Sequence, residues 1–247
     1  MRQKIKILFL AANPNDRTRL ELKREFSAIQ DALLRGKYRD DFQLLGPQLT
    51  TRMKNFSSAL TTQQPHIVHF CGHGSANQGI VFEGEDGYSR LAGKQELTTL
   101  FEKLTRNARL VFLNACHTKE QAEMLGRTFD YTIGTNGRIM DKDAGDFAGA
   151  FYRLLFDGAT VEGAFLSAQS AVDNRVNEIS VLSKREGAND SIPFVRQVLG
   201  HARLPKKSGG FNITINDNGK VGNIIPVTGR HARVEINQEP HKSRRKR

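Results

Sequence analysis

The sequence contains few cysteines, no long hydrophobic run and no internal repeat of solenoid length. Two cysteines among 247 residues argue against a disulfide framework, so each is treated as a free thiol. No apolar run approaches the ~20 residues that a membrane helix needs. With 38% hydrophobic and 26% charged residues, the composition is ordinary for a soluble globular protein. The length allows one large α/β domain and a modest appendage.

The main part of the chain also has little net charge. The formal net charge is +11, but residues 201–247 contain eleven Lys/Arg against three Asp/Glu and so carry +8 of it. The remaining +3 is small for 200 residues. No aromatic platform or groove-reading motif accompanies the basic tail, so we expect no nucleic-acid binding beyond nonspecific contacts of that tail.

The first residues, MRQKIKILFLAANPND, place a basic residue before an apolar stretch, as a signal peptide does. The stretch Ile5–Ala12 ends at Asn13-Pro14 and is better interpreted as a buried first strand. We therefore expect a cytoplasmic protein that does not associate with membranes.

Short apolar runs alternate with helical patterns along most of the chain, which predicts an α/β fold with a mostly parallel sheet covered on both faces. A first helix is predicted to open at Asp16 or Thr18 and to close at Gly36. The predicted strands are Ile5–Ala11, Phe42–Leu49, His66–Cys71, Gly79–Glu83, Tyr88–Leu91, Leu110–Leu113 and Tyr131–Gly134. The other predicted helices are Met53–Leu60, Lys94–Arg106, Glu120–Phe129, Ala144–Phe156 and Thr160–Val176.

The composition changes after residue 200. We predict a main domain over 1–200, a linker over 201–210, a small β unit over 211–237 and a disordered basic tail over 238–247. Within the small unit, Phe211–Ile215 and Arg233–Ile236 alternate with period two. The unit is too small for a robust core of its own, so it is expected either to pack on the main domain or to pair its exposed edges with an activating or sensor protein. The alternative is a solvated, basic extension.

Two reactive side chains follow neighbouring strands of the predicted sheet. His73 comes just after the third strand and Cys116 just after the fourth. Because the carboxyl ends of parallel strands meet at one edge, the two side chains can face one another. A thiol of ordinary pKa, about 8.5, needs a neighbouring imidazole to take its proton at neutral pH. The sequence therefore predicts a Cys–His dyad.

The surrounding residues suit acyl transfer. A helix predicted just after Cys116 favours a thiolate at its N-terminus. Gly72 and Gly74 flank His73 and allow a tight turn. The backbone amides of Gly74 and Cys116 are the expected donors to a developing oxyanion.

Plainer interpretations exist for the same residues. A single cysteine after an apolar strand is usually core packing, and a single loop histidine usually makes only a polar contact. His69, Cys71, His73 and Cys116 could also form a zinc site, but no paired CxxC or HxxxH element supports it. We predict no metal and no cofactor, with Cys71, His66, His69 and His117 as bystanders.

The segments VHFCGHGS (68–75) and LVFLNACHT (110–118) resemble the His and Cys motifs of caspase-like peptidases of the CHAT family. KILFLAANPND, GIVFEGEDG and IGTNGRIMDKDAGDFAGAF also follow in that family's order. The resemblance covers about residues 4–175. It implies a caspase-like three-layer αβα sandwich and a cysteine endopeptidase acting on protein substrates, with His73 and Cys116 as the dyad.

The resemblance also suggests roles for residues around the dyad. Asn114 lies where relatives hold a polar residue beside the nucleophile, and its expected role is to orient the loop. Asp141 lies where the family's substrate-pocket loop runs, and it is the candidate pocket acid. Asp143 and Asp146 compete for that role, although charge at a helix N-terminus is the better explanation for both.

Two residues depart from the family pattern, namely Cys71 in the His motif and Thr135 after Ile-Gly. Many bacterial members of the family belong to defence systems, so we expect a regulated effector in antiviral defence or signalling. The alternatives are a catalytically silent scaffold that acts by protein binding, and a nucleic-acid-associated module that uses the tail.

Overall fold

The computed structural model describes residues 3–48, 52–75, 79–172, 180–200, 210–215 and 221–227. The chain divides into two compact units, Met1–Ala202 and Arg203–Arg247, and each is described by itself. The finer division predicted at 201–210, 211–237 and 238–247 stays a prediction, because most of these residues lie outside the described ranges.

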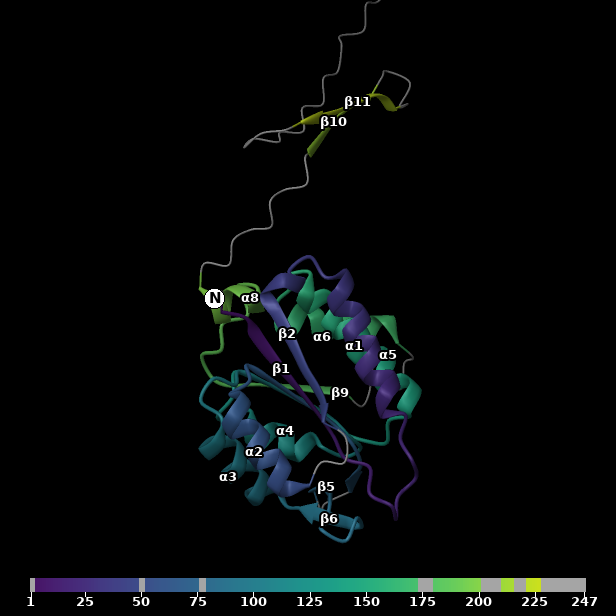
Figure 1. The fold of residues 1–247 in the computed structure, drawn as a ribbon. Helices are drawn as coiled ribbons and strands as arrows, with labels where there is room; N and C mark the ends of the chain where they lie inside the picture. Colours follow the sequence, from purple (N-terminus) through teal and green to yellow (C-terminus); the bar gives the residue numbers. More distant parts are fainter. Residues whose placement is uncertain are drawn as a thin grey trace, which may run out of the picture. The chain divides into compact units, whose positions relative to one another are not determined.

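A six-stranded sheet forms the centre of the first unit (Figure 1). Its strand order is β2-β1-β3-β7-β8-β9, and only the pairing of β9 with β8 is antiparallel. The strands are β1 (Ile5–Ala11), β2 (Phe42–Gln48), β3 (Ile67–Cys71), β7 (Leu110–Asn114), β8 (Tyr131–Thr135) and β9 (Ser180–Lys184).

Helices cover both faces of this sheet, which confirms the predicted three-layer α/β arrangement (Figure 1). One layer consists of α1 (Leu22–Arg35), α5 (Asp141–Phe156) and α6 (Val161–Ala171), with the short α8 (Phe194–Leu199) beside them. The other layer consists of α2 (Met53–Gln63), α3 (Lys94–Leu104) and α4 (Lys119–Leu125).

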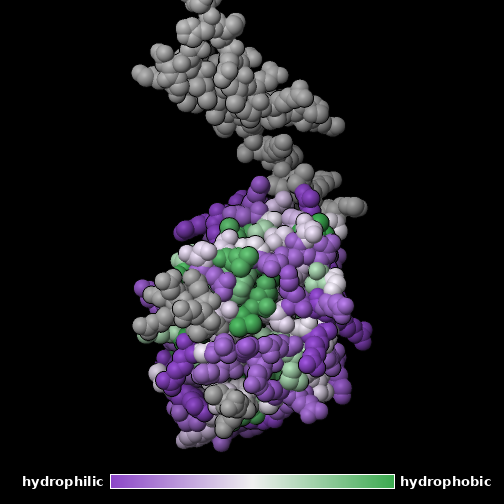
Figure 2. Space-filling model, turned by 180° about the vertical axis from the view of Figure 1, so that it is seen from behind, coloured by the Kyte–Doolittle hydropathy of each residue, from purple (hydrophilic) through white to green (hydrophobic). Residues whose placement is uncertain are grey.

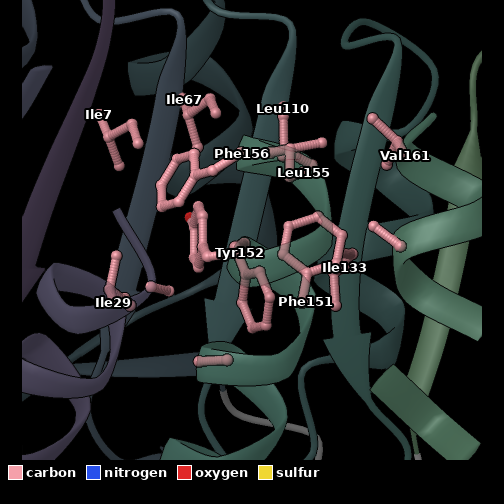
Figure 3. Close-up of a cluster of buried hydrophobic side chains, with 14 of the residues drawn as sticks. Ile7, Ile29, Ile67, Leu110, Ile133, Phe151, Tyr152, Leu155, Phe156 and Val161 are labelled. Atoms are coloured by element: carbon pink, nitrogen blue, oxygen red, sulfur yellow. The ribbon is translucent and has the colours of Figure 1, made fainter. Parts of the chain in front are cut away.

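Two hydrophobic cores, one on each side of the sheet, explain the apolar character of the strands. In β1, Ile7 and Phe9 belong to the core under α1 and α5, whereas Leu8 and Leu10 belong to the core under α2 and α3. Because successive side chains of a strand point to opposite faces, a strand buried on both faces has a continuous apolar run. Figure 3 shows the first core, in which Tyr152 and the neighbouring side chains of α5 lie against the sheet.

Helices α1 and α5 pack closely because α5 presents two glycines to α1. A Cβ atom at Gly149 would lie 3.3 Å from the Cβ of Ala28, and one at Gly145 would lie 3.7 Å from the Cα of Glu25. The first turn of α5 therefore runs next to the first turn of α1. This contact brings Glu25 toward the carboxyl edge of the sheet.

The predicted start of the first helix was wrong, because α1 begins at Leu22 rather than at Asp16 or Thr18. The side chain of Asp16 accepts hydrogen bonds from the amide and the hydroxyl of Ser89, both at 2.8 Å. The carbonyl of Thr18 accepts a hydrogen bond from His73. These distant partners hold residues 12–21 as an irregular loop.

The described residues also form two smaller sheets. A three-stranded sheet of β4 (Gly74–Ser75), β5 (Gly79–Glu83) and β6 (Ser89–Ala92) follows β3 directly. In the second unit, β10 (Gly210–Ile215) pairs antiparallel with β11 (Val221–Val227). The strand predicted at Arg233–Ile236 lies outside the described residues.

The surface of the first unit is mainly polar. Figure 2 shows hydrophilic residues around one strip of hydrophobic ones on the face opposite to that of Figure 1. The most exposed large hydrophobic side chains include Leu34, Met140 and Leu166. Within the described ranges, no helix has the length and hydropathy needed to span a membrane.

Candidate active site

The pairing of β3 with β7 places the segments that carry His73 and Cys116 side by side. Cys71 is the register partner of Asn114, and the amide of Gly72 donates to the carbonyl of Asn114 at 3.3 Å. The chain continues for two residues beyond each partner to reach His73 and Cys116. Both side chains line the same small cavity, of about 40 Å³.

Gly74 determines how closely the two segments approach. A Cβ atom at this position would overlap the carbonyl oxygen of Cys116 and lie 3.2 Å from its amide nitrogen. Only glycine fits here without movement of the backbone. Residue 74 must therefore be glycine because the backbone of Cys116 lies directly against it.

The ring of His73 has a fixed partner on one nitrogen. Its Nε2 atom lies 2.9 Å from the carbonyl oxygen of Thr18, which can only accept, so Nε2–H is the donor. In the neutral ring, Nδ1 is therefore the nitrogen that can take a proton. The loop before α1 thus selects the tautomer of the proposed base.

The surroundings keep His73 neutral. Burial of the half-buried ring lowers its pKa below the ordinary value, and the positive charge of Arg17 lowers it further. The hydrogen bond to Thr18 and the charges of Asp141 and Asp16 act in the opposite direction but do not outweigh burial. A neutral imidazole at pH 7 is the form that a general base requires.

A titration of His73 tests this arrangement directly. The pKa of His73 is expected below its ordinary value of 6.5, and Arg17→Gln is expected to raise it because a neighbouring positive charge is removed. Since a lowered pKa means that the folded state binds fewer protons, the stability contribution is complete above pH 6.5 and is lost as the pH falls through the folded pKa. The ring C–H resonances in NMR spectra report the pKa. A value at or above 6.5 in the wild-type protein would contradict this environment.

Cys116 is half-buried at the start of a fixed loop. Its Sγ lies 3.8 Å from the carbonyl oxygen of Ile139, and within the described residues its amide donates to no protein acceptor. The carbonyl of the preceding Ala115 accepts from the hydroxyls of Thr118 and Thr135 at 2.9 and 2.6 Å. The loop is therefore held in place while the amide of Cys116 stays available to a ligand.

Asn114, the predicted loop-orienting residue, is buried beneath this loop and takes part in a polar cluster. Its amide donates to the carbonyl of Ala144 at 3.1 Å and also to the carboxylate of Glu25. These bonds join the end of β7 to the first turns of α1 and α5. The side chain can thus orient the loop that carries Cys116.

Glu25 is the centre of this cluster and is only 4% exposed. Its carboxylate accepts from Nε2 of His69 at 2.7 Å, from Sγ of Cys71 at 2.7 Å and from Asn114. The other ring nitrogen of His69 lies 3.2 Å from the hydroxyl of Tyr152. A buried carboxylate with three donors connects the ends of β3 and β7, the two strands that lead to the dyad.

His69 and Cys71, two members of the alternative zinc set, are engaged in this cluster instead. His69 is fully buried, stacks on Phe9 at 5.0 Å and has both ring nitrogens engaged. Burial, and then the charge of Glu25, raise the pKa of Cys71 well above its ordinary range. The part of the chain that the structure describes contains no group of three or more His, Cys, Asp or Glu side chains placed to hold a metal ion.

Asp141, the predicted pocket acid, lies at the first position of α5 and lines the dyad cavity. Its Oδ2 atom accepts from the amide of Glu21 at 3.0 Å, so it also fixes the loop before α1. Asp146 faces Arg24 at 3.7 Å, and neither Asp146 nor Asp143 lines the cavity. Of the three aspartates, only Asp141 is beside the dyad.

Sequence reasoning missed Glu25, Tyr152 and the carbonyl of Thr18. The role of a backbone carbonyl cannot be predicted from the residue type. Glu25 could have been found, because it lies between Leu22 and Ile29 on the buried stripe of α1, where an apolar residue is expected. A charged residue at a core position indicates a buried partner or a functional site.

Comparison with known proteins gives one family match and several distant relatives. The family model described as CHAT domain matches residues 8–178. A Roc-COR-CHAT protease from an unknown prokaryotic organism is 25% identical over 176 residues, covering 69% of this chain and 17% of that protein. A probable protease of Gillisia limnaea is 25% identical over 154 residues, covering 62% and 27%. The matched part of this chain therefore spans less than a third of the length of each of these relatives.

Among solved structures, the Arg specific cysteine proteinase gingipain R is similar, with a TM-score of 0.49 and 14% identity. The alignment covers 90% of this chain and 58% of that one.

Proposed function

This chain belongs to the CHAT-domain family, and on that premise we propose that it is a cysteine endopeptidase using Cys116 as nucleophile and His73 as general base. The observation that carries the proposal is the cavity that His73 and Cys116 both line, together with the close packing of Gly74 against the backbone of Cys116. The distant relatives named as proteases support the same activity.

In the proposed acylation step, Nδ1 of His73 takes the proton of the Cys116 thiol, and the sulfur attacks the carbonyl carbon of the scissile peptide bond. The amides of Gly74 and Cys116 donate to the oxyanion. Protonated His73 then gives its proton to the leaving amine, and the C–N bond breaks to leave a thioester. Thr18 holds Nε2–H throughout, so the ring keeps its orientation during both transfers.

The thioester is then hydrolysed. A water molecule attacks the thioester carbon while Nδ1 of His73 takes one of its protons. The intermediate collapses, the C–S bond breaks, and the new carboxylic product leaves. The proton returns to the sulfur of Cys116. No cofactor takes part in this sequence of steps.

We keep Asp141 as the proposed acid of the substrate pocket. Its position on the dyad cavity and the effect of its charge on His73 support this role. We further propose that the protein is a regulated effector of a bacterial defence or signalling system, that it acts in the cytoplasm, and that the region 211–237 docks an activating or sensor protein. The family resemblance supports the first part, the two free cysteines agree with the second, and the paired strands β10 and β11 support the third.

A library of electrophilic peptide probes tests the activity. We expect probes to label Cys116 in the wild-type protein, His73→Ala to reduce the labelling strongly, and Cys116→Ala to abolish it. The proposal fails if no probe labels Cys116 even when candidate activating proteins are present. That outcome would favour the alternative of a catalytically silent scaffold acting by protein binding.

A further inference from the structure

A second, much larger hollow adjoins the dyad cavity. Its volume is about 730 Å³, and it is lined mainly by the segment between Asn13 and Arg24, with Glu83 on another side. Leu20, Glu21 and Leu22 line both this hollow and the dyad cavity. This larger hollow, which we call the groove, therefore lies beside the site of the proposed chemistry, and its volume is enough for several side chains of a bound peptide.

The groove is lined by more positive than negative charge. Arg17, Arg19, Lys23 and Arg24 contribute four cationic side chains against the two carboxylates of Glu21 and Glu83. All four cationic residues are exposed, whereas Glu83 is buried.

Both carboxylates already have cationic partners. Glu83 lies 3.5 Å from Arg52, which is outside the groove, and Glu21 lies 3.6 Å from Arg24. Among the described residues, Arg19 and Lys23 form no ion pair with any carboxylate. Two positive charges in the groove are thus available to a ligand.

The cationic segment also touches the proposed base. The carbonyl of Thr18, between Arg17 and Arg19, lies 2.9 Å from the ring of His73. The charge of Arg17 acts on the same ring. A peptide with its scissile bond at Cys116 would therefore place the neighbouring residues of its chain over this segment.

We propose that this groove binds acidic side chains next to the scissile bond of the protein substrate, with Arg19 and Lys23 as the main contacts. The inference deepens the proposed peptidase function by naming the charge pattern of its substrate. Each exposed ion pair contributes little by itself, so discrimination depends on two or more pairs acting together. The same charges also attract acidic segments over a longer range and raise the rate of encounter at low salt.

Paired peptides test the substrate preference. Two peptides share a sequence that the enzyme cleaves and differ only in flanking residues, which are Glu in one and Gln in the other. For the wild-type protein, we expect kcat/KM to be about fivefold higher for the Glu peptide at low salt, with the difference shrinking as salt rises. Arg19→Glu/Lys23→Glu is expected to abolish or reverse the preference.

A matched control separates the groove from the overall charge of the chain. Lys37→Glu/Arg39→Glu makes the same change in net charge at exposed positions beyond the other end of α1. We expect this variant to keep the preference for the Glu peptide. Equal loss in both variants, or no preference in the wild-type protein, would overturn the proposal.

A binding measurement keeps the groove separate from the activity. The Cys116→Ala variant is titrated into fluorescein-labelled Glu and Gln peptides and followed by fluorescence anisotropy, with and without the groove substitutions. Tighter binding of the Glu peptide that depends on Arg19 and Lys23 supports the groove even if no peptide is cleaved, in which case only the peptidase function fails. Equal affinity for the two peptides overturns the groove proposal even if both are cleaved.

Discussion

Cys116→Ala is expected to reduce peptide hydrolysis by about 10⁴-fold or more while leaving the protein folded. Covalent catalysis is lost without the sulfur, and the remaining oxyanion donors and binding contacts supply only a small residual rate. Among the described residues, the one hydrogen bond of the sulfur is the long contact with the carbonyl of Ile139 at 3.8 Å, so its removal breaks no strong polar interaction. The measurement is kcat/KM on a peptide identified with the probe library, together with the urea midpoint of unfolding.

His73→Ala is expected to cause a loss of similar size, because residues that act as a unit have non-additive effects. The kcat/KM of the double variant Cys116→Ala/His73→Ala should therefore be hardly lower than that of either single variant. Cys71→Ser is the matched control for the thiol, since serine still donates to Glu25. His66→Gln is the control for the imidazole, because His66 directly precedes the first residue of β3. Retained activity in Cys116→Ala, or an equal loss in the controls, would contradict the dyad.

Glu25→Gln is expected to lower the free energy of unfolding by about 2–3 kcal/mol and to lower activity as well. Glu25 accepts three hydrogen bonds in the buried cluster, and an amide in its place would point donor atoms at donors on His69, Cys71 or Asn114. At least one buried polar group would lose its partner, which costs more than the loss of an exposed hydrogen bond. The ends of β3 and β7 would be less firmly joined, so His73 and Cys116 would be less well aligned.

The matched control is Glu21→Gln, the same chemical change four residues earlier on an exposed side chain. Its pair with Arg24 is at 3.6 Å on the surface and should be worth well under 1 kcal/mol. Equilibrium unfolding in urea measures both variants. If Glu25→Gln lost no more stability than Glu21→Gln, the buried cluster would not be what holds these strand ends together.

The parallel strands β1, β3 and β7 could be predicted from the sequence because they are buried on both faces and are almost entirely apolar. Strand β9 (Ser180–Lys184) was missed because it lies at the edge, has partly exposed side chains and contains two serines and a lysine. Strand β11 (Val221–Val227), which pairs with β10, was also missed.

The active site likewise contains residues that could be predicted from the sequence and residues that could not. His73 and Cys116 could be placed because each directly follows an apolar strand, and the ends of neighbouring parallel strands share an edge. The supporting residues could not, because their contacts connect positions far apart in the chain, such as Thr18 with His73 and Glu25 with Asn114. No local pattern encodes such contacts.

The most direct test of the dyad is the rate at which iodoacetamide alkylates Cys116 at pH 7, with and without His73. Mass spectrometry of the folded protein follows both cysteines, and Cys71 is the internal reference because it is buried with a raised pKa. If His73 takes the thiol proton, Cys116 reacts faster than Cys71, and His73→Ala slows its reaction by about tenfold or more. An unchanged rate for Cys116 in His73→Ala would show that the two residues do not act as a pair.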